Sequence, residues 1–273
     1  MLKVLLPTDF SSTSHNAIVY ALNMFDGFDI DIELLHVIFY DGEDEEIIKN
    51  FKKTALKQFE TLKSDLQKQK IRIPKEFNFH ITHGVEVSKI IDDYASSHKI
   101  EMLIIGATGE IYSTSHLLSE RTIELISLTT IPVLSIPKNT KYNKITDIIY
   151  ATDLSDIDFE AGELIAFAKL FDAAVHFVHV FPEMLGTTKF NPVHISNDLI
   201  KKFKYPNITF DAIMDNDVEK SLIEFIDKKK PSIVAMFTHK RKIIEQLFYN
   251  SVSKEVSYNI DAPIFTFKKN TVK

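Results

Sequence analysis

The chain has 273 residues, of which 45% are hydrophobic and 26% are charged, so its composition is that of a folded protein with one large domain or two ordinary ones. Acidic residues outnumber basic ones by 38 to 32, and the formal net charge of −6 argues against a nucleic-acid-binding protein, because phosphate backbones select basic surfaces. Cysteine is absent, which excludes disulfide bonds, thiolate nucleophiles and cysteine-ligated zinc.

Apolar strand patterns alternate with amphipathic helix patterns along the first half of the chain. Strands are expected at residues 2–6, 32–37, 77–82, 101–105 and 132–136, and helices at 12–25, 44–69, 86–98 and 117–129. Strands such as VLLP and MLII are apolar throughout, which is typical of a parallel sheet covered by helices on both faces. The pattern predicts a doubly wound α/β domain with a five-stranded parallel sheet.

The second half repeats the landmarks of the first in the same order. KVLLPTDFS at 3–11 corresponds to DIIYATDLS at 147–155, and the later LLHV and IPVLSIP correspond to FVHV and APIFTF. Its second helix is expected to be weaker, because residues 186–199 partly resemble a loop. A polar segment, PKNTKYNK, separates the halves, so we predict two tandem domains, residues 1–139 and 140–273.

No apolar run approaches the roughly 20 residues that a membrane-spanning helix needs. The N-terminal MLKVLLPTDF is too short for a signal segment and is broken by Pro7 and Asp9. We therefore expect a cytoplasmic protein that binds neither membrane nor nucleic acid.

Ligands of doubly wound sheets bind beyond the carboxyl ends of the strands, where the strand order reverses. Pro7, Thr8 and Asp9, the region of Val37, and residues 106–109 follow three strand ends and are expected to line one crevice. Asp9 either caps the helix that follows or accepts a hydrogen bond from a ribose hydroxyl, whereas capping is favoured for its counterpart Asp153.

Two histidines, His36 and His179, stand at matching positions in the two halves. They could serve metal binding or acid–base chemistry, but they lie in different copies. We interpret each as a partly buried structural histidine with a local hydrogen bond.

The segments PTDFS (7–11), LLHV (34–37), GATG (106–109) and IPVLSI (131–136) resemble those of the universal stress protein family in its tandem two-domain form. The resemblance covers essentially the whole chain. It implies two domains of the adenine nucleotide alpha hydrolase-like fold that form an intramolecular pseudo-dimer through their closing strands. It also implies a non-catalytic stress-response protein whose first domain senses an adenine nucleotide, ATP or AMP, or another phosphorylated ligand, with Mg²⁺ only where ATP binds.

The nucleotide-binding branch of that family has a loop of Gly, two residues, Gly, nine residues and then Gly-Ser or Gly-Thr, whose amides hold phosphates. Carried over, the ligand-binding positions are Pro7, Thr8, Asp9, Val37, Gly106, Thr108, Gly109, Ser119 and Glu120. The chain departs from the pattern at Ser119 and Glu120, which replace the last glycine and the hydroxyl residue. Ser119 could instead N-cap the next helix, with Glu120 in its first turn, and the Glu120 carboxylate would repel a phosphate.

The second copy departs further, since Phe237 and Lys240 replace the two glycines of the loop. Its basic run THKRK (238–242) could hold an anion through side chains, although we favour a solvated basic turn. The candidate ligand-binding residues of this copy are Asp153, His239, Lys240, Arg241 and Ser251.

Catalytic motifs such as G-x-S-x-G, H-E-x-x-H and the Walker loop are missing, and no metal site is expected. Catalysis is therefore the less favoured hypothesis, and two alternatives to a nucleotide sensor stay open. One is a scaffold or interaction pseudo-dimer that binds no nucleotide, and the other is a very slow ATPase. The expected partners are the chain itself, as pseudo-dimer or homodimer, and unidentified proteins.

Overall fold

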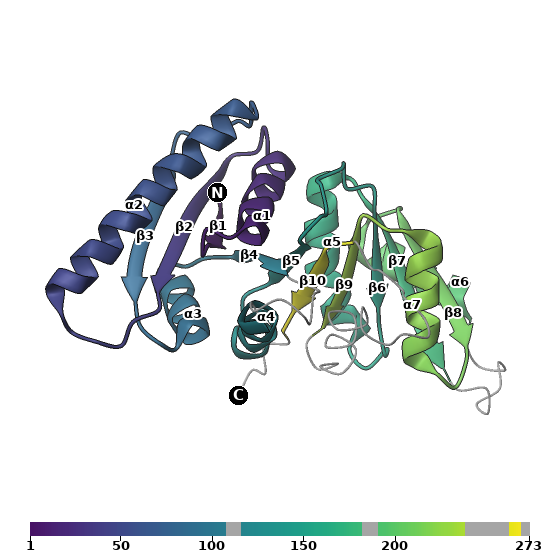
Figure 1. Cartoon of the computed structure of the whole chain (residues 1–273). Helices are drawn as coiled ribbons and strands as arrows, with labels where there is room; N and C mark the ends of the chain where they lie inside the picture. The colour runs from purple at the N-terminus through teal and green to yellow at the C-terminus, as the bar shows by residue number, and fades with distance from the viewer. Residues whose placement is uncertain (108–115, 182–190, 238–261, 269–273) are drawn as a thin grey trace. The chain divides into compact units, whose positions relative to one another are not determined.

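The chain forms two compact units, Met1–Tyr142 and Asn143–Lys273. The computed structural model describes residues 1–107, 116–181, 191–237 and 262–268, without the side chains of residues 116–121 and 219. Each unit is an α/β domain (Figure 1). The polar segment in which the sequence places the domain boundary contains the point of division.

Strands and helices alternate through unit 1. In chain order they are β1 (Leu2–Pro7), α1 (Ser12–Met24), β2 (Ile30–Ile38), α2 (Glu45–Lys68), β3 (Phe77–His83), α3 (Val87–Ser97), β4 (Met102–Ala107), α4 (His116–Leu128) and β5 (Val133–Pro137). The strands pair in parallel in the order β3-β2-β1-β4-β5. The expected doubly wound α/β fold is confirmed, and the elements differ from the sequence prediction only at their ends.

Unit 2 repeats this arrangement. Its elements are β6 (Asp147–Ala151), α5 (Ile157–Phe171), β7 (Ala174–Phe181), α6 (Pro192–Phe203), β8 (Ile208–Met214), α7 (Val218–Lys229), β9 (Ile233–Phe237) and β10 (Ile264–Phe267). The strands pair in parallel in the order β8-β7-β6-β9-β10, which matches the order β3-β2-β1-β4-β5 of unit 1 strand for strand. The weaker second helix is present as α6, while residues 182–190 lie outside the described part. Packing of the two halves through their closing strands stays a prediction.

The core of unit 1 lies on both faces of its sheet. Consecutive β1 residues Val4, Leu5 and Leu6 are all fully buried, although their side chains point alternately to opposite faces. Right-handed crossovers put α1 and α2 on one face and α3 and α4 on the other (Figure 1). The long helix α2 buries Ala55, Phe59, Leu62 and Leu66 at three- and four-residue steps, whereas Phe51, which continues the same apolar stripe, is exposed.

Side chains next to the helix starts stabilise α1 and α2. Ser11 caps α1 by accepting a hydrogen bond from the Ser14 amide at 3.2 Å. Asp44 caps α2 by accepting from the amides of Glu46 and Ile47 at 2.9 and 3.1 Å. Both caps satisfy amide groups that have no partner within the helix. Of the described helices, none has the length and apolar character needed to span a membrane.

Candidate functional site

A tight turn joins β1 to α1 through local hydrogen bonds. The Thr8 Oγ1 accepts from the Phe10 amide at 3.0 Å, and the Asp9 Oδ1 accepts from the Ser11 amide at 3.0 Å. Phe10 has φ 60°, a left-handed conformation that is uncommon outside glycine, and these hydrogen bonds stabilise it. Because Ser11 is the N-cap of α1, the capping interpretation of Asp9 is wrong.

Unit 2 has the same turn between β6 and α5. The Thr152 Oγ1 accepts from the Leu154 amide at 3.0 Å, the Asp153 Oδ1 accepts from the Ser155 amide at 2.9 Å, and Leu154 has φ 67°. The N-cap of α5 is Asp156, so Asp153 does not cap this helix as expected. The Thr-Asp pair thus has a structural role in both copies, with or without a ligand.

The two matching histidines hold these turns to the neighbouring strands. The His36 Nδ1 lies 2.8 Å from the Thr8 carbonyl oxygen, and the His179 Nδ1 lies 2.9 Å from the Thr152 carbonyl oxygen. A carbonyl oxygen only accepts, so each imidazole donates from Nδ1. Their interpretation as partly buried structural histidines is confirmed. Within the described residues, no group of three or more potential ligands could hold a metal ion.

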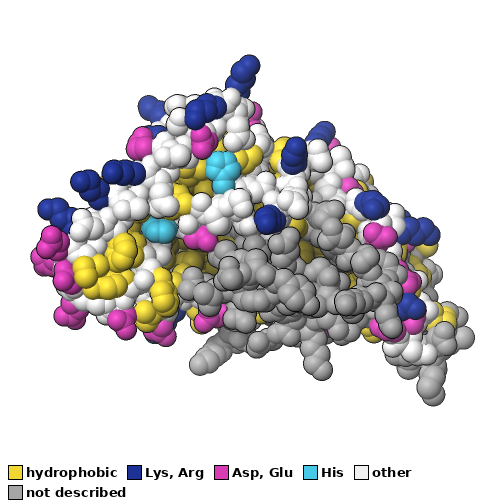
Figure 2. Space-filling view, viewed as in Figure 1, with side chains coloured by type: hydrophobic (Ala, Val, Ile, Leu, Met, Phe, Trp, Pro, Cys, Tyr) yellow, Lys and Arg dark blue, Asp and Glu magenta, His cyan; other side chains and the backbone are white. Residues whose placement is uncertain are grey.

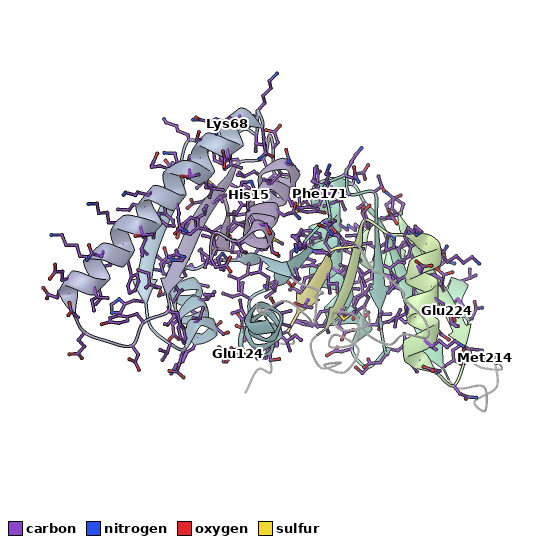
Figure 3. The ribbon with its side chains drawn as sticks, viewed as in Figure 1. His15, Lys68, Glu124, Phe171, Met214 and Glu224 are labelled. Atoms are coloured by element: carbon purple, nitrogen blue, oxygen red, sulfur yellow. The ribbon has the colours of Figure 1, made fainter. Side chains whose placement is uncertain are left out.

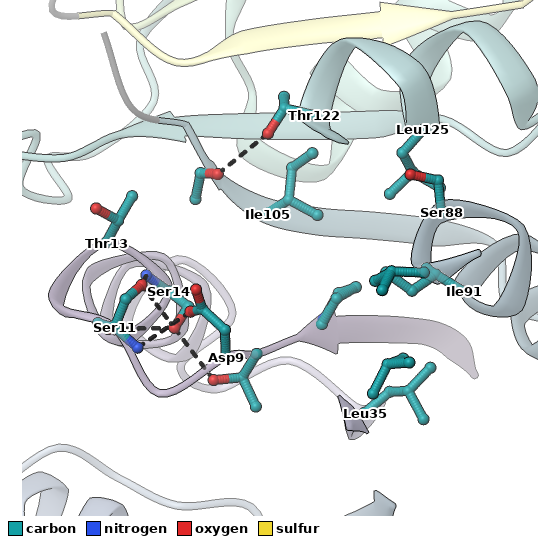
Figure 4. Close-up of a pocket in the computed structure, with 15 residues that line it drawn as sticks. Asp9, Ser11, Thr13, Ser14, Leu35, Ser88, Ile91, Ile105, Thr122 and Leu125 are labelled. Atoms are coloured by element: carbon teal, nitrogen blue, oxygen red, sulfur yellow. Dashed lines mark hydrogen bonds between the residues drawn. The ribbon is translucent and has the colours of Figure 1, made fainter. Parts of the chain in front are cut away.

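A cavity of about 100 Å³ lies at the carboxyl ends of β1, β2 and β4 (Figure 4). Among the residues that line it are five of those expected from the sequence, namely Pro7, Thr8, Asp9, Val37 and Gly106. They come from three segments that are distant in sequence. The parallel sheet brings these segments together because the strands that precede them end at the same edge.

Two helices also contribute residues that the sequence analysis missed. Val87, Ser88 and Ile91 line the cavity from α3, and Thr122 and Leu125 line it from α4. Their apolar spacing predicts a buried helix face but does not show that part of this face borders a cavity. The Ser88 hydroxyl donates to the Glu124 carboxylate at 2.6 Å, which joins α3 to α4 beside the cavity (Glu124 is labelled in Figure 3).

The described lining is mostly apolar and uncharged. Leu35, Val37 and Ile105 are among its apolar residues, and Thr8, Ser11, Thr13 and Ser14 bring hydroxyl groups. Its one charged side chain is that of Asp9, which is exposed. The second oxygen of that carboxylate, Oδ2, has no hydrogen-bond partner among the described residues. The turn uses only Oδ1, so Oδ2 is available to a ligand.

Gly106 has a packing role in addition to its place in the cavity wall. A Cβ atom at this position would lie 2.7 Å from both the Cγ2 and the carbonyl oxygen of Thr13, and 2.8 Å from its carbonyl carbon. These distances are too short for any real side chain, so only glycine allows α1 to approach β4 this closely. A close approach of a ligand is therefore not needed to explain this glycine.

The corresponding position in unit 2 is Phe237, as the pairing of β4 with β1 and of β9 with β6 shows. Its side chain is 1% exposed, and its ring stacks on Phe267 with centroids 5.3 Å apart. The ring also meets Phe159 of α5, with centroids 6.3 Å apart. In unit 2, aromatic side chains therefore pack at the position that corresponds to the close approach of α1 to β4 in unit 1.

The remaining expected site residues lie beyond the described structure. Thr108 and Gly109 fall outside it, as do His239, Lys240, Arg241 and Ser251 of the second copy. Ser119 and Glu120 lie within α4, but their side chains are not among those described. Because α4 begins at His116, Ser119 is not its N-cap and Glu120 is not in its first turn, so both of those expectations are wrong.

Comparison with known proteins connects this geometry to a family. The model of the Universal stress protein family matches residues 1–137. A universal stress protein from Archaeoglobus fulgidus has a TM-score of 0.71 at 17% identity, covering 97% of this chain and 98% of that one. A protein of unknown function from Pseudomonas aeruginosa has a TM-score of 0.55 at 11% identity, covering 97% of this chain and 92% of its own. No curated protein matches the sequence.

Proposed function

Because this chain belongs to the universal stress protein family, we propose that unit 1 is a non-catalytic sensor that binds an adenine nucleotide in the cavity beside β1. The observation that carries the proposal is the convergence of Pro7, Thr8, Asp9, Val37 and Gly106 on one cavity. In the nucleotide-binding branch that the sequence resembles, the first four positions belong to the nucleoside end of the site, and Gly106 corresponds to the first phosphate-binding glycine.

The chemistry of the described lining fits the nucleoside part of such a ligand. Apolar side chains such as Leu35 and Val37 suit the faces of an adenine ring. The Asp9 carboxylate, with one oxygen held by the turn, has its other oxygen available to accept from a ribose hydroxyl or the adenine amino group. A hydrogen bond to a charged acceptor of this kind contributes about 1.5–3 kcal/mol.

The same lining has no cationic side chain to neutralise phosphates. Phosphate binding would therefore depend on amide groups, on Mg²⁺ alongside ATP, or on residues 108–121, whose side chains are not described. Hydroxyl groups of Ser11, Thr13 and Ser14 stand at the start of α1, where the helix dipole favours a negative charge. We expect adenosine and AMP to bind at least as well as ATP when Mg²⁺ is absent.

The test is calorimetric titration of the full chain with adenosine, AMP and ATP, each with and without Mg²⁺. The informative variant is Asp9→Asn, because asparagine keeps the Oδ1 acceptor that the Ser11 amide needs but replaces Oδ2 by an amide donor. We expect it to weaken binding roughly tenfold or more. Asp153→Asn makes the identical change in the matching turn of unit 2 and should leave affinity unchanged.

The outcomes separate the proposal from its alternatives. An absence of binding by all three ligands would overturn the proposal in favour of a scaffold that binds no nucleotide. Equal weakening by both aspartate variants would mean that the effect comes from the turns and not from a ligand contact. Steady release of phosphate from ATP that is lost in Asp9→Asn would show that unit 1 is a slow ATPase and not a non-catalytic sensor.

The cytoplasmic location, the pseudo-dimer or homodimer, and unidentified protein partners belong to the same proposal. The sequence properties described above support them. Analytical ultracentrifugation with and without AMP would measure the oligomeric state and its dependence on ligand.

A further inference from the structure

An exposed apolar surface lies where β2 and β3 end and α2 begins. We call it the aromatic patch and define it by Phe39, Tyr40, Ile47, Phe51 and Val85. Phe39 is 62% exposed, Val85 47%, Phe51 43% and Ile47 40%. Large apolar side chains are seldom exposed in a group on a protein surface, and such groups mark interaction sites.

Two contacts bring the segments that carry these side chains together. The rings of Tyr40 and Phe51 have centroids 5.7 Å apart, which joins the segment after β2 to the first turns of α2. The Gly84 amide donates to the Ile38 carbonyl oxygen at 3.0 Å, which brings the residues that follow β2 and β3 side by side. Phe39 and Val85 are the next residues along these two segments, so all five residues of the patch lie at the same end of unit 1.

Acidic side chains border the patch on the side of α2. The segment DGEDEE contributes Asp41, Glu43, Asp44, Glu45 and Glu46, all of them exposed. Hydrophobic and acidic side chains lie next to one another at this end of the unit in Figure 2. Capping of α2 by Asp44 and the helix dipole both stabilise negative charge here, so the acidic border is compatible with a stable helix start.

Lysines of α2 follow this acidic border without balancing its charge. Residues 41–54 contain five carboxylate side chains and three lysines, Lys49, Lys52 and Lys53. A helix turns by about 100° per residue, so these lysines lie about 100° or more around the axis from Phe51. The patch therefore combines exposed aromatic surface with a border of net negative charge.

We propose that the aromatic patch docks a cationic protein segment that carries an aromatic or aliphatic anchor residue. The apolar side chains would take the anchor, and the carboxylates at 41–46 would pair with lysine or arginine beside it. The same carboxylates repel nucleic acid and anionic lipid surfaces, which leaves a basic polypeptide as the complementary partner. This surface is separate from the cavity, although Val37 and Val87 of the cavity lie two residues from Phe39 and Val85.

The test is selection of a phage-displayed library of random peptides on the full-length chain. The selected peptides are then measured on Phe39→Ser/Phe51→Ser, and both phenylalanines are exposed enough for this variant to stay folded. We expect the selected peptides to be rich in lysine or arginine together with leucine or an aromatic residue. Their affinity should fall about tenfold or more in the double variant, the loss typical of a removed aromatic anchor.

A charge variant and a matched control complete the experiment. Glu43→Gln/Glu45→Gln/Glu46→Gln keeps the Asp44 cap and should also lower the affinity of the selected peptides. The affinity that remains should depend less on salt concentration than it does in the unaltered chain. Leu56→Ser changes another exposed residue of α2, 52% exposed and away from the patch, and should leave their affinity unchanged.

Three results would overturn the proposal. One is enrichment of peptides without net positive charge, and another is unchanged affinity in Phe39→Ser/Phe51→Ser. The third is a change from dimer to monomer in that variant, seen by sedimentation, because it would identify a second copy of this chain as the occupant.

Discussion

Replacing Gly106 by alanine is the sharpest test of how unit 1 is built. The new Cβ atom would meet three atoms of Thr13 at 2.7–2.8 Å. Two of these are backbone atoms of α1, which cannot rotate away as a flexible side chain can. The helix must therefore move away from β4, or the strand must bend.

The expected cost follows from this geometry. Overpacking a well-packed core costs about 1–3 kcal/mol, and backbone contacts place this case in the upper part of that range. Alanine in a strand offsets about 0.5–1 kcal/mol of it relative to glycine. We expect Gly106→Ala to lower the free energy of unfolding of unit 1 by about 2 kcal/mol.

Gly162→Ala is the matched control in unit 2. Its Cβ atom would lie 3.5 Å from the nearest heavy atom, the Phe203 Cε1, which is an ordinary contact. Because Gly162 lies inside α5, alanine should stabilise unit 2 by up to about 1 kcal/mol. Identical chemical changes thus have opposite expected signs in the two units.

The assay is native-state hydrogen exchange read by mass spectrometry. Two compact units make a single unfolding curve hard to assign, whereas peptides from β1, α1 and β4 report on unit 1 alone. Adding Thr13→Ser removes only the Cγ2 contact, so it should rescue Gly106→Ala in part. Unchanged exchange of unit 1 in Gly106→Ala, together with lost AMP binding, would refute the packing argument and assign this glycine to the ligand alone.

Two further predictions concern buried tyrosines. Burial raises the pKa of Tyr20 and of Tyr150, and the hydrogen bond from Tyr150 to Glu160 adds to the effect in the second case. The unfolded chain then ionises first, so the stability that each tyrosine contributes to its own unit is present below about pH 10 and is lost above it, by about 1.4 kcal/mol per pH unit for each tyrosine. Urea unfolding followed separately in peptides of each unit, between neutral and alkaline pH, measures this slope, and phenolate absorbance showing both residues ionised near pH 10 in the folded chain would contradict it. Tyr150→Phe should destabilise unit 2 by about 1–3 kcal/mol, because it removes the hydroxyl that donates a hydrogen bond to the Glu160 carboxylate, and Glu160 is only 1% exposed. Adding Glu160→Leu should recover most of that loss in the same exchange assay, and a loss that persists would point to packing of the ring instead.

The secondary structure was predictable because its causes are local in the sequence. A strand buried on both faces is apolar at consecutive positions, as in Val4, Leu5 and Leu6, and an amphipathic helix repeats apolar residues at three- and four-residue steps, as in α2. The duplication was visible for the same reason, since matching strands and turns keep matching residues. The parallel sheet then followed from the alternation of strands and helices, and with it the edge of the sheet where a cavity forms.

The roles of individual site residues depended on tertiary contacts. Asp9 stands where either a cap or a ligand contact was plausible, and only the fold shows that its Oδ1 serves the turn while Ser11 caps α1. Ser119 could not be placed as a cap or an interior residue until α4 was seen to begin at His116.

Distances between elements decided the rest. Gly106 resembles a phosphate-binding glycine in the sequence, but its requirement comes from Thr13, a residue on a helix distant in the chain. The cavity residues of α3 and α4 carry no motif, because their apolar side chains would look the same in a filled core. By itself, therefore, the sequence determined the fold, the duplication and the edge of the sheet at which the cavity lies. The tertiary structure decided which side chains share the cavity and which glycine the packing requires, because those properties depend on distances between elements that local patterns do not encode.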